Sequence, residues 1–277
     1  MDMPAMGSTV SRRQLGRRLR RLREQAGKSD RDVEAAGLVS KTTLWRIENG
    51  KTRIKVADAR ALCWLYGADQ ALTDAIAALA LKTAEQGLLE DFGGDLPEWF
   101  GMYVELESTA TEIRIYDPEV VHGLFQTPDY VQALYDGSGQ PHPQPEISRQ
   151  IKLRQSRQKL ITSRKPPLRT SVIFGEGVLT RQVGGPAVMA EQKQRLTELA
   201  ALPHVDIWIL TWRAGAHAAM HTGPFTVLDF ASPDDPAVAY IESHTGARYL
   251  EKPVEVDAYR RIHELCRKQA VPLKEYL

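Results

Sequence analysis

Three glycines within the first fifty residues divide the start of the chain into short helical segments. Gly27, Gly37 and Gly50 each follow a segment with helical character, and glycine commonly ends an α-helix. Ser29 and Ser40 precede the next two segments, where a serine oxygen can accept hydrogen bonds from the first free backbone amides. This punctuation predicts two short helices joined by a tight turn, which is the spacing of a helix-turn-helix.

The segments around this pair also have helical patterns. Leu15, Leu19 and Leu22 recur at a helical period between Ser11 and Ala26, and an apolar stripe of this kind is typical of an amphipathic helix. Two further helices are predicted over 56–66 and 72–86. Together they predict a compact five-helix domain over residues 11–86.

The basic residues of the chain are concentrated in this domain. Residues 1–60 contain 15 Lys and Arg against 7 Asp and Glu, whereas residues 61–277 contain 21 against 28, although the net charge of the whole chain is only +1. A basic N-terminal part favours a polyanionic partner such as nucleic acid. The alternative is a solvated basic surface that binds nothing.

The stretch VSKTTLWRIENGKTRI (residues 39–54) contains the helix that most resembles a DNA-reading element. Leu44 and Ile47 are predicted to face the core, together with Val33 and Ala36 of the preceding helix. The opposite face then carries polar and basic side chains, and a helix of this length fits the major groove. The residues predicted to contact DNA are Lys41, Thr42, Thr43, Trp45, Arg46 and Asn49 of this helix and its end, Lys51 and Arg53 beyond it, and Ser29 and Arg31 at the start of the helix before it.

These residues have different expected roles. Lys41 and Arg46 can donate to guanine, whereas Lys51 and Arg53 are suited to phosphate contacts, which set register and salt dependence. Glu48 is predicted to pair with Arg23 and to fix the angle between their two helices. A helical bundle that docks a protein partner is the alternative for this region.

The run Arg46-Ile47-Glu48-Asn49-Gly50-Lys51, with Leu15-Gly16 and Val39-Ser40 before it, resembles the xenobiotic-response-element (XRE) family of helix-turn-helix repressors. This resemblance covers residues 11–67 and implies that the outward residues of the helix face bases and that Glu48 buttresses the fold. The chain departs from the family at Asp30, where a glutamine that anchors phosphate is frequent. Because a carboxylate repels phosphate, Lys28 or Arg31 would have to take over that contact.

The rest of the chain has a different pattern. Gly87–Pro97 is rich in Gly and Asp and is predicted to be a linker. Residues 98–277 mix helical segments with short apolar runs such as Val205–Leu210, and several of these runs follow each other across short turns. We therefore expect an α+β domain with a mostly antiparallel sheet, preceded by an all-α domain.

The stretch VHGLFQTPDYVQAL (residues 121–134) is the most distinctive text in this second part. It resembles the C-terminal domain of actinobacterial XRE regulators of the WhiJ-like kind, and further similar positions, including Arg154, Arg157 and Gln192, extend over most of the chain. The resemblance implies a transcription factor whose DNA binding is modulated by a ligand or by a small protein encoded beside it, in a toxin–antitoxin-like arrangement. The residues themselves also allow a purely structural interpretation, because Thr127, Pro128 and Asp129 are ordinary helix-start residues.

Candidate ligand-binding or partner-binding residues in this part are few. Gln126 and Tyr130 could line a pocket, Arg213 and His217 could bind an anionic ligand, and Glu176 is a further carboxylate candidate. His217, His221 and His244 do not have the spacing of a known metal site, and no nucleophile motif is present. The sequence therefore predicts no metal, no cofactor, no catalytic residue and no enzymatic activity.

The remaining features favour a cytoplasmic DNA-binding regulator. The two cysteines have no CxxC spacing, and no apolar run has the roughly 18 residues of a membrane span. A homodimer on a palindromic double-stranded operator is expected, because one helix-turn-helix offers a small contact area. The alternatives are an antitoxin-like docking protein whose DNA binding is autoregulatory, and an enzyme fused to a DNA-binding domain.

Overall fold

The computed structural model describes residues 10–50, 52, 54–85, 98–231 and 235–277. The chain forms two compact units, Met1–Thr109 and Ala110–Leu277. Each unit is treated by itself below. The predicted linker at Gly87–Pro97 lies outside the described residues, and the predicted domain boundaries stay predictions.

The first unit is helical, as expected. Its helices are α1 (Val10–Gln25), α2 (Asp30–Ala35), α3 (Lys41–Glu48), α4 (Val56–Leu65), α5 (Gln70–Glu85) and α6 (Glu98–Thr109). Gly27, Gly37 and Gly50 follow the first three helices with positive φ angles of 64°, 70° and 64°. A side chain with a Cβ disfavours this backbone conformation, so the three glycines end their helices where the sequence predicts.

The core of the helical unit is built from the predicted leucines and from both helices of the pair. Leu15, Leu19 and Leu44 are at most 2% exposed and pack with Val33. The prediction that Ala36 faces this core is wrong, because Ala36 is exposed. Leu38 and Val39, in the turn between α2 and α3, pack there instead, since α2 ends one residue before Ala36 and its last turn no longer faces inward.

The second unit contains a seven-stranded sheet, which confirms the expected α+β class. The strands are β1 (Glu112–Asp117), β2 (Arg169–Gly175), β3 (Val205–Leu210), β4 (Phe225–Asp229), β5 (Val238–Ser243), β6 (Gly246–Leu250) and β7 (Val271–Pro272). Their order in the sheet is β6-β5-β4-β1-β2-β3-β7. Only the β1–β2 and β2–β3 pairs are parallel, and the other pairs are antiparallel.

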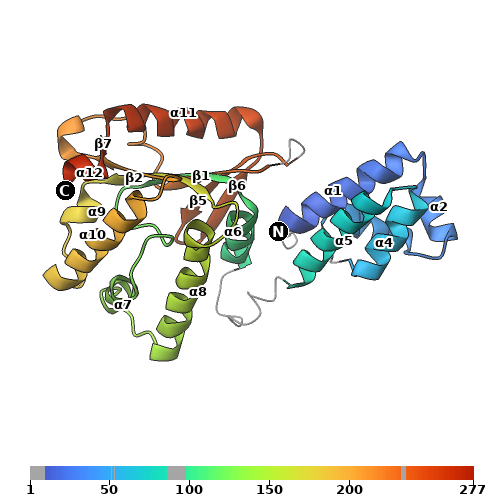
Figure 1. Ribbon diagram of the computed structural model, residues 1–277, viewed down its shortest axis with the longest axis horizontal. Coiled ribbons are helices and arrows are strands. Elements are labelled where there is room, and N and C mark those ends of the chain that lie inside the picture. The colour runs from blue at the N-terminus through green and yellow to red at the C-terminus, as the bar shows by residue number, and fades with distance from the viewer. Residues whose placement is uncertain (1–9, 51, 53, 86–97, 232–234) are drawn as a thin grey trace. The chain divides into compact units, whose positions relative to one another are not determined.

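Helices cover both faces of this sheet (Figure 1). Helix α11 (Pro253–Gln269) lies along one face, and the other face carries α7 (Pro128–Asp136), α8 (Gln144–Thr162) and α10 (Pro186–Ala200). Tyr116 packs with Val256 and Cys266 of α11. Because side chains alternate along a strand, Ile115 and Asp117 of β1 point to the opposite face, as does Phe174 of β2, which contacts Phe125 edge to face.

The chain changes direction at β1. From β1 it proceeds through β2 and β3 to one side of the sheet, and it then returns to place β4, β5 and β6 on the other side. In open sheets, ligands frequently bind outside the carboxyl ends of the strands at such a switch point. Asp117 is the last residue of β1 and therefore lies at this point.

Several short elements of the second unit were not expected from the sequence: α9 (Gly177–Thr180), the 3-10 helix η3 (Trp212–Ala214), β7 and α12 (Leu273–Tyr276). The aromatic residues Trp212 and Phe225 differ in burial. Phe225 is 3% exposed, but Trp212 is 70% exposed, because η3 turns it out of the sheet after β3 has ended. On α11, His263 and Cys266 are both buried.

Candidate nucleic-acid interface

Helices α2 and α3 are each fixed at their start by a serine. The Ser29 hydroxyl accepts a hydrogen bond from the Asp32 backbone N–H, and the Asp32 carboxylate accepts one from the Ser29 N–H at 2.7 Å, which completes a capping box. The hydrogen bond from the Ser29 backbone lowers the pKa of Asp32. Ser40 accepts from the Thr43 N–H at 3.3 Å. Both ends of the turn are thus determined by local side-chain chemistry.

Helix α1 crosses the end of α3 at a glycine. A Cβ placed on Gly16 would lie 2.3 Å from the Ile47 carbonyl oxygen and 2.7 Å from that of Glu48. These distances are far below van der Waals contact, so only glycine allows the two backbones to approach this closely. The close crossing fixes how far α3 lies from the rest of the unit.

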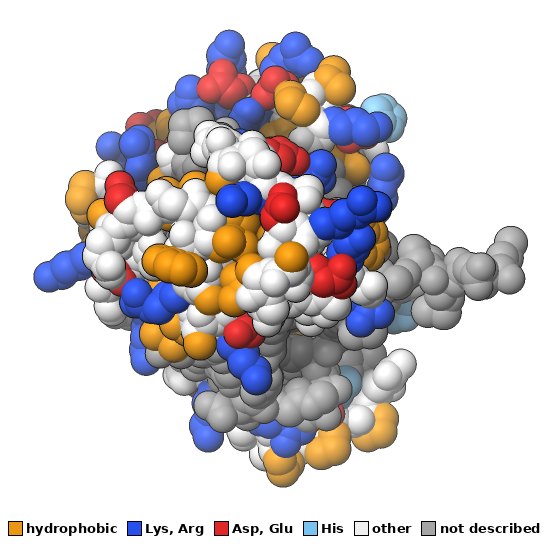
Figure 2. Space-filling view, turned by 90° about the vertical axis from the view of Figure 1, so that its right-hand side faces the viewer, with side chains coloured by type: hydrophobic (Ala, Val, Ile, Leu, Met, Phe, Trp, Pro, Cys, Tyr) orange, Lys and Arg blue, Asp and Glu red, His pale blue; other side chains and the backbone are white. Residues whose placement is uncertain are grey.

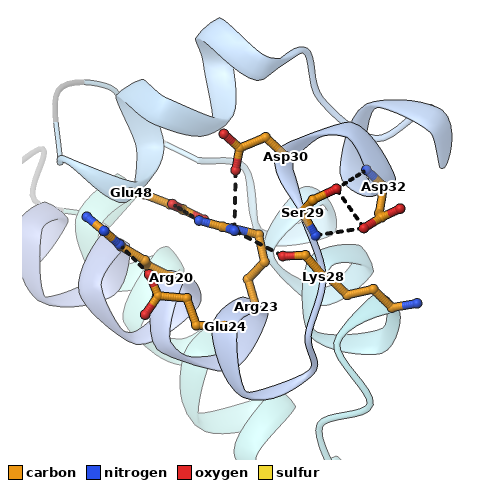
Figure 3. A network of polar contacts seen from close by, with 8 residues as sticks. All are labelled: Arg20, Arg23, Glu24, Lys28, Ser29, Asp30, Asp32 and Glu48. Atoms are coloured by element: carbon orange, nitrogen blue, oxygen red, sulfur yellow. Dashed lines mark hydrogen bonds and ion pairs between the residues drawn. The ribbon is translucent and has the colours of Figure 1, made fainter.

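A largely buried ion pair fixes the orientation of the same crossing (Figure 3). Arg23 donates from Nε to Oε1 of Glu48 at 2.6 Å and from Nη2 to Oε2 at 2.8 Å, and its Nη1 donates to the Lys28 carbonyl at 3.0 Å. The Arg23 and Glu48 side chains are only 12% and 6% exposed, and the hydrogen bond to Glu48 raises the pKa of Arg23. The predicted pairing of these residues is confirmed. A two-pronged contact of this kind restrains both helices more than a point charge would.

Asp30 has a structural partner as well. Its Oδ1 lies 3.3 Å from Nη1 of Arg23 (Figure 3). The carboxylate that departs from the XRE pattern is therefore partly neutralised within the protein. Arg31, beside it on α2, is exposed and forms no ion pair with any described residue.

The outward face of α3 carries four of the predicted DNA-contacting residues. Lys41, Thr42, Trp45 and Arg46 are all exposed, while Leu44 and Ile47 on the opposite side are buried. Trp45 is 52% exposed. Lys and Arg side chains lie at several places on the side of the molecule drawn in Figure 2, among acidic and apolar ones.

Two other predicted residues of this helix are engaged internally. The Thr43 hydroxyl lies 2.9 Å from the Ser40 hydroxyl, and the Asn49 side-chain N–H donates to the Trp45 carbonyl at 2.8 Å. The same carbonyl also accepts from the Asn49 backbone N–H at 3.0 Å, so Asn49 closes the end of α3 with both its backbone and its side chain. Both residues stabilise the ends of α3 in the absence of DNA.

Glu34 of α2 occupies the N-terminal end of α3. Its Oε1 accepts from the Lys41 backbone N–H at 3.4 Å, and its Oε2 lies 4.0 Å from the Lys41 ammonium. The carboxylate therefore stands at a helix end that favours anions. Lys51 and Arg53, the predicted phosphate contacts, lie outside the described residues.

The candidates in the second unit are used mainly for folding. Gln126 donates to the Val121 carbonyl at 2.6 Å and accepts from Arg154 Nε at 2.7 Å, and the Tyr130 hydroxyl accepts from the Val121 N–H at 3.2 Å. Gln126 is 6% exposed and Tyr130 is fully buried. These contacts hold the VHGLFQTPDYVQAL segment in place without any ligand.

The other three candidates do not converge on one point. Glu176 accepts from the Trp212 backbone N–H at 2.5 Å and from the Tyr276 hydroxyl at 3.0 Å. His217 lies with Nδ1 at 3.9 Å from the Cys266 thiol, and burial lowers its pKa. Arg213 is exposed. Among the residues that the structure describes, no group of three His, Cys, Asp or Glu side chains is arranged to hold a metal ion.

Gln192 is a structural residue whose contacts the sequence did not show. It is fully buried on α10, its side-chain oxygen accepts from the Thr127 N–H at 2.8 Å, and its side-chain nitrogen donates to the Phe125 carbonyl at 2.8 Å. The resemblance to WhiJ-like regulators includes Gln192, and this was the one sequence signal that pointed to the residue. The contact itself joins residues more than sixty positions apart, so no local pattern could predict it.

The geometry of α1 to α5 defines the class of this domain. A capped α2–turn–α3 pair, buttressed by Arg23 and Glu48 and presenting an exposed polar face on α3, is a helix-turn-helix domain. A comparison with family models agrees, because a helix-turn-helix domain matches residues 14–76.

The larger part of the chain matches a second family model, described as a domain of unknown function (DUF5753), over residues 100–275. The chain belongs to this family. Comparisons with curated proteins and with solved structures gave no match. No described helix is long and apolar enough to cross a lipid bilayer.

Proposed function

We propose that the protein is a sequence-specific DNA-binding transcriptional regulator, and that α3 is its recognition helix. The observation that carries the proposal is the exposed face of Lys41, Thr42, Trp45 and Arg46 on a helix whose other side is locked into the core. A helix held rigidly at its base and polar on its outer face is what major-groove reading requires. The excess of basic residues in the first sixty positions supports the same function.

Within this proposal Arg46 reads a base and the basic residues around α3 contact phosphates. Arg46 forms no ion pair with a described residue, so its guanidinium is available to donate to guanine O6 and N7. Lys41 must exchange its contact with Glu34 for one with DNA. The side chains of Thr43 and Asn49 stabilise the two ends of α3. Their contribution to DNA binding is to keep the recognition helix formed.

The test begins with recovery of bound fragments from genomic DNA, followed by affinity measurements on the recovered sequence and on a random duplex. Arg46→Ala should weaken the recovered sequence by about 1–3 kcal/mol and relax one base position, with a smaller effect on random DNA. The matched control is Arg60→Ala on α4, where Arg60 pairs with Asp74 at 2.7 Å away from α3. Equal losses for both variants, or equal losses on both duplexes, would remove α3 from the role of recognition helix.

We further propose that the protein acts as a homodimer on a palindromic operator. The support is physical: a single recognition helix of eight residues covers few base pairs, and two copies one helical turn of DNA apart raise affinity and specificity together. Light scattering of the free protein and of its complex tests this. A single copy bound per palindrome would contradict it.

The second unit is proposed to modulate DNA binding through a ligand or a small protein, and the protein is proposed not to be an enzyme. The support for modulation is the resemblance of residues 121–134 to WhiJ-like regulators. The antitoxin-like alternative is tested by identifying small proteins that co-purify with the chain when its bound DNA is recovered. A small protein that co-purifies and releases the DNA would favour this alternative. The cytoplasmic location stays a prediction from the sequence.

A further inference from the structure

One large apolar side chain stands among the polar ones on the outward face of α3. Trp45 is 52% exposed, and Lys41, Thr42 and Arg46 beside it are exposed as well. Side chains three or four positions apart are neighbours on a helix surface, so Trp45 borders both Lys41 and Thr42 on the preceding turn. All four side chains belong to the first two turns of α3, and the first turns of a recognition helix are the part that reaches base edges.

The backbone that carries Trp45 is held in place from several sides. Leu44, the residue before it, is buried in the core of the helical unit. The Trp45 carbonyl accepts from the backbone N–H of Asn49 at 3.0 Å and from its side-chain N–H at 2.8 Å. At the end of the same helix, Glu48 is bound to Arg23 (Figure 3). The indole is therefore presented from a rigid element, as the reading of a base requires.

The indole of Trp45 differs from its polar neighbours in what it can recognise. The ring has a single hydrogen-bond donor, Nε1–H, and no acceptor, so it lacks the paired groups with which arginine reads guanine. The rest of its surface is apolar. The base edges in the major groove present donors, acceptors and one apolar group, which is the C5-methyl group of thymine. An exposed indole on this face is therefore matched to a thymine methyl group, and their contact removes apolar surface of both from water.

Thr42 offers a second apolar contact at the same place. It precedes Trp45 by three positions, and its exposed side chain carries a methyl group beside the hydroxyl. Lys41, the other neighbour on that turn, has its ammonium 4.0 Å from the Glu34 carboxylate. The apolar part of the outward face thus consists of Trp45 and the methyl group of Thr42, next to the guanidinium of Arg46.

We propose that Trp45, together with the methyl group of Thr42, selects a thymine in the operator through its C5-methyl group. This inference rests on the proposed DNA-binding function and deepens it by assigning a base to one residue of α3. Arg46 reads a guanine close to that thymine. A cytosine methylated at C5 is then accepted at the same position better than cytosine itself, because both pyrimidines carry the methyl group on the same ring carbon.

The experiment uses the full chain and the sequence recovered from genomic DNA. Each thymine of that sequence is replaced in turn by deoxyuridine, which removes only the C5-methyl group and keeps the base pair. At least one replacement should weaken binding about threefold to fivefold, the loss expected for one buried methyl group. When the same thymine is replaced by cytosine, methylation of that cytosine at C5 should recover about the same factor.

Two variants connect this effect to its residues. Trp45→Ala should bind the thymine and uracil forms of the sensitive position equally, because the partner of the methyl group is gone. Thr42→Ser removes only the methyl group of the side chain and should reduce the difference between the two forms. The matched control is Trp64 on α4, which is 82% exposed in the same helical unit. Trp64→Ala should keep the full difference.

The uracil series on the unchanged chain needs no variant, so a folding defect of Trp45→Ala does not decide the outcome. The inference is overturned if the chain selects a sequence in which no uracil replacement weakens binding, and the proposed DNA-binding function then stands without it. It is also overturned if Trp45→Ala keeps the difference between thymine and uracil, or if Trp64→Ala abolishes that difference as completely as Trp45→Ala does. A chain that selects no sequence at all would overturn both proposals.

Discussion

Replacing Glu48 by Gln tests how the recognition helix is held. The change keeps the size of the side chain but removes its charge and places an amide N–H opposite a guanidinium N–H of Arg23. Breaking a buried ion pair by removing one partner costs roughly 3–5 kcal/mol. We expect about 3 kcal/mol, at the low end of that range, because Arg23 keeps the Lys28 carbonyl and Asp30 as partners and is 12% exposed.

The measurement must be specific to the helical unit, because a chain with two compact units need not unfold in one step. Amide hydrogen exchange of peptides from α1 and α3, followed by mass spectrometry, provides this. A loss of about 3 kcal/mol lowers the protection of these amides roughly a hundredfold, since 1.4 kcal/mol corresponds to a factor of ten.

Two further variants decide what the result means. Arg20→Met removes the exposed pair of Arg20 with Glu24 on the same helix and should leave protection unchanged. Arg23→Met combined with Glu48→Leu removes both charges and should cost much less than Glu48→Gln alone, because no buried charge is left without its partner. If Glu48→Gln leaves protection within about threefold of the unchanged chain, the buttressing role assigned to this pair is refuted.

Four other predictions follow from single contacts. Gly16→Ala should destabilise the helical unit by about 1–3 kcal/mol, because its Cβ would overlap the Ile47 carbonyl; unchanged α1 and α3 exchange would contradict this. Gln192→Leu should cost the second unit about 2–4 kcal/mol in chemical unfolding, because two buried backbone groups lose their partners, and an unchanged midpoint would count against it. Glu34→Gln should tighten binding to every DNA duplex, since it removes a negative charge from the end of α3 that favours anions such as phosphate. Tighter binding to the operator alone would contradict this reasoning. Burial lowers the pKa of His263 to about 4, so as the pH falls the unfolded chain protonates this histidine before the folded chain does. The free energy of unfolding should therefore fall by about 3 kcal/mol between pH 6.5 and 4. His263→Gln should remove this pH dependence.

Local sequence signals were sufficient for the helical unit. Ser29 and Ser40 begin their helices and the three glycines end them, because capping and positive φ depend on residues a few positions apart. The Arg23–Glu48 pair was also predictable, since the helix-turn-helix spacing fixes where α1 meets α3. Ala36 was misplaced because the helical period was extended one residue past the end of α2.

The second unit shows where such signals stop. Its class, most of its helices and the strands Arg169–Gly175 and Val205–Leu210 could be predicted from periodicity, but β7 and η3 are too short to have a period. The order of the strands also depends on pairing between distant segments, which local patterns do not contain.

By itself, then, the sequence determined most of the longer helices and strands and that residues 40–49 carry a polar face, because these properties arise from neighbours along the chain. Only the tertiary structure decided that Gln126 and Tyr130 are tied to backbone groups rather than open to a ligand. It alone brought Asp117 of β1 close to Glu242 of β5, where that carboxylate adds to burial in raising the pKa of Asp117. The physical reason is that the charge around a side chain is set by whatever the fold packs against it, and in this sheet those neighbours come from segments up to 125 positions apart in the chain.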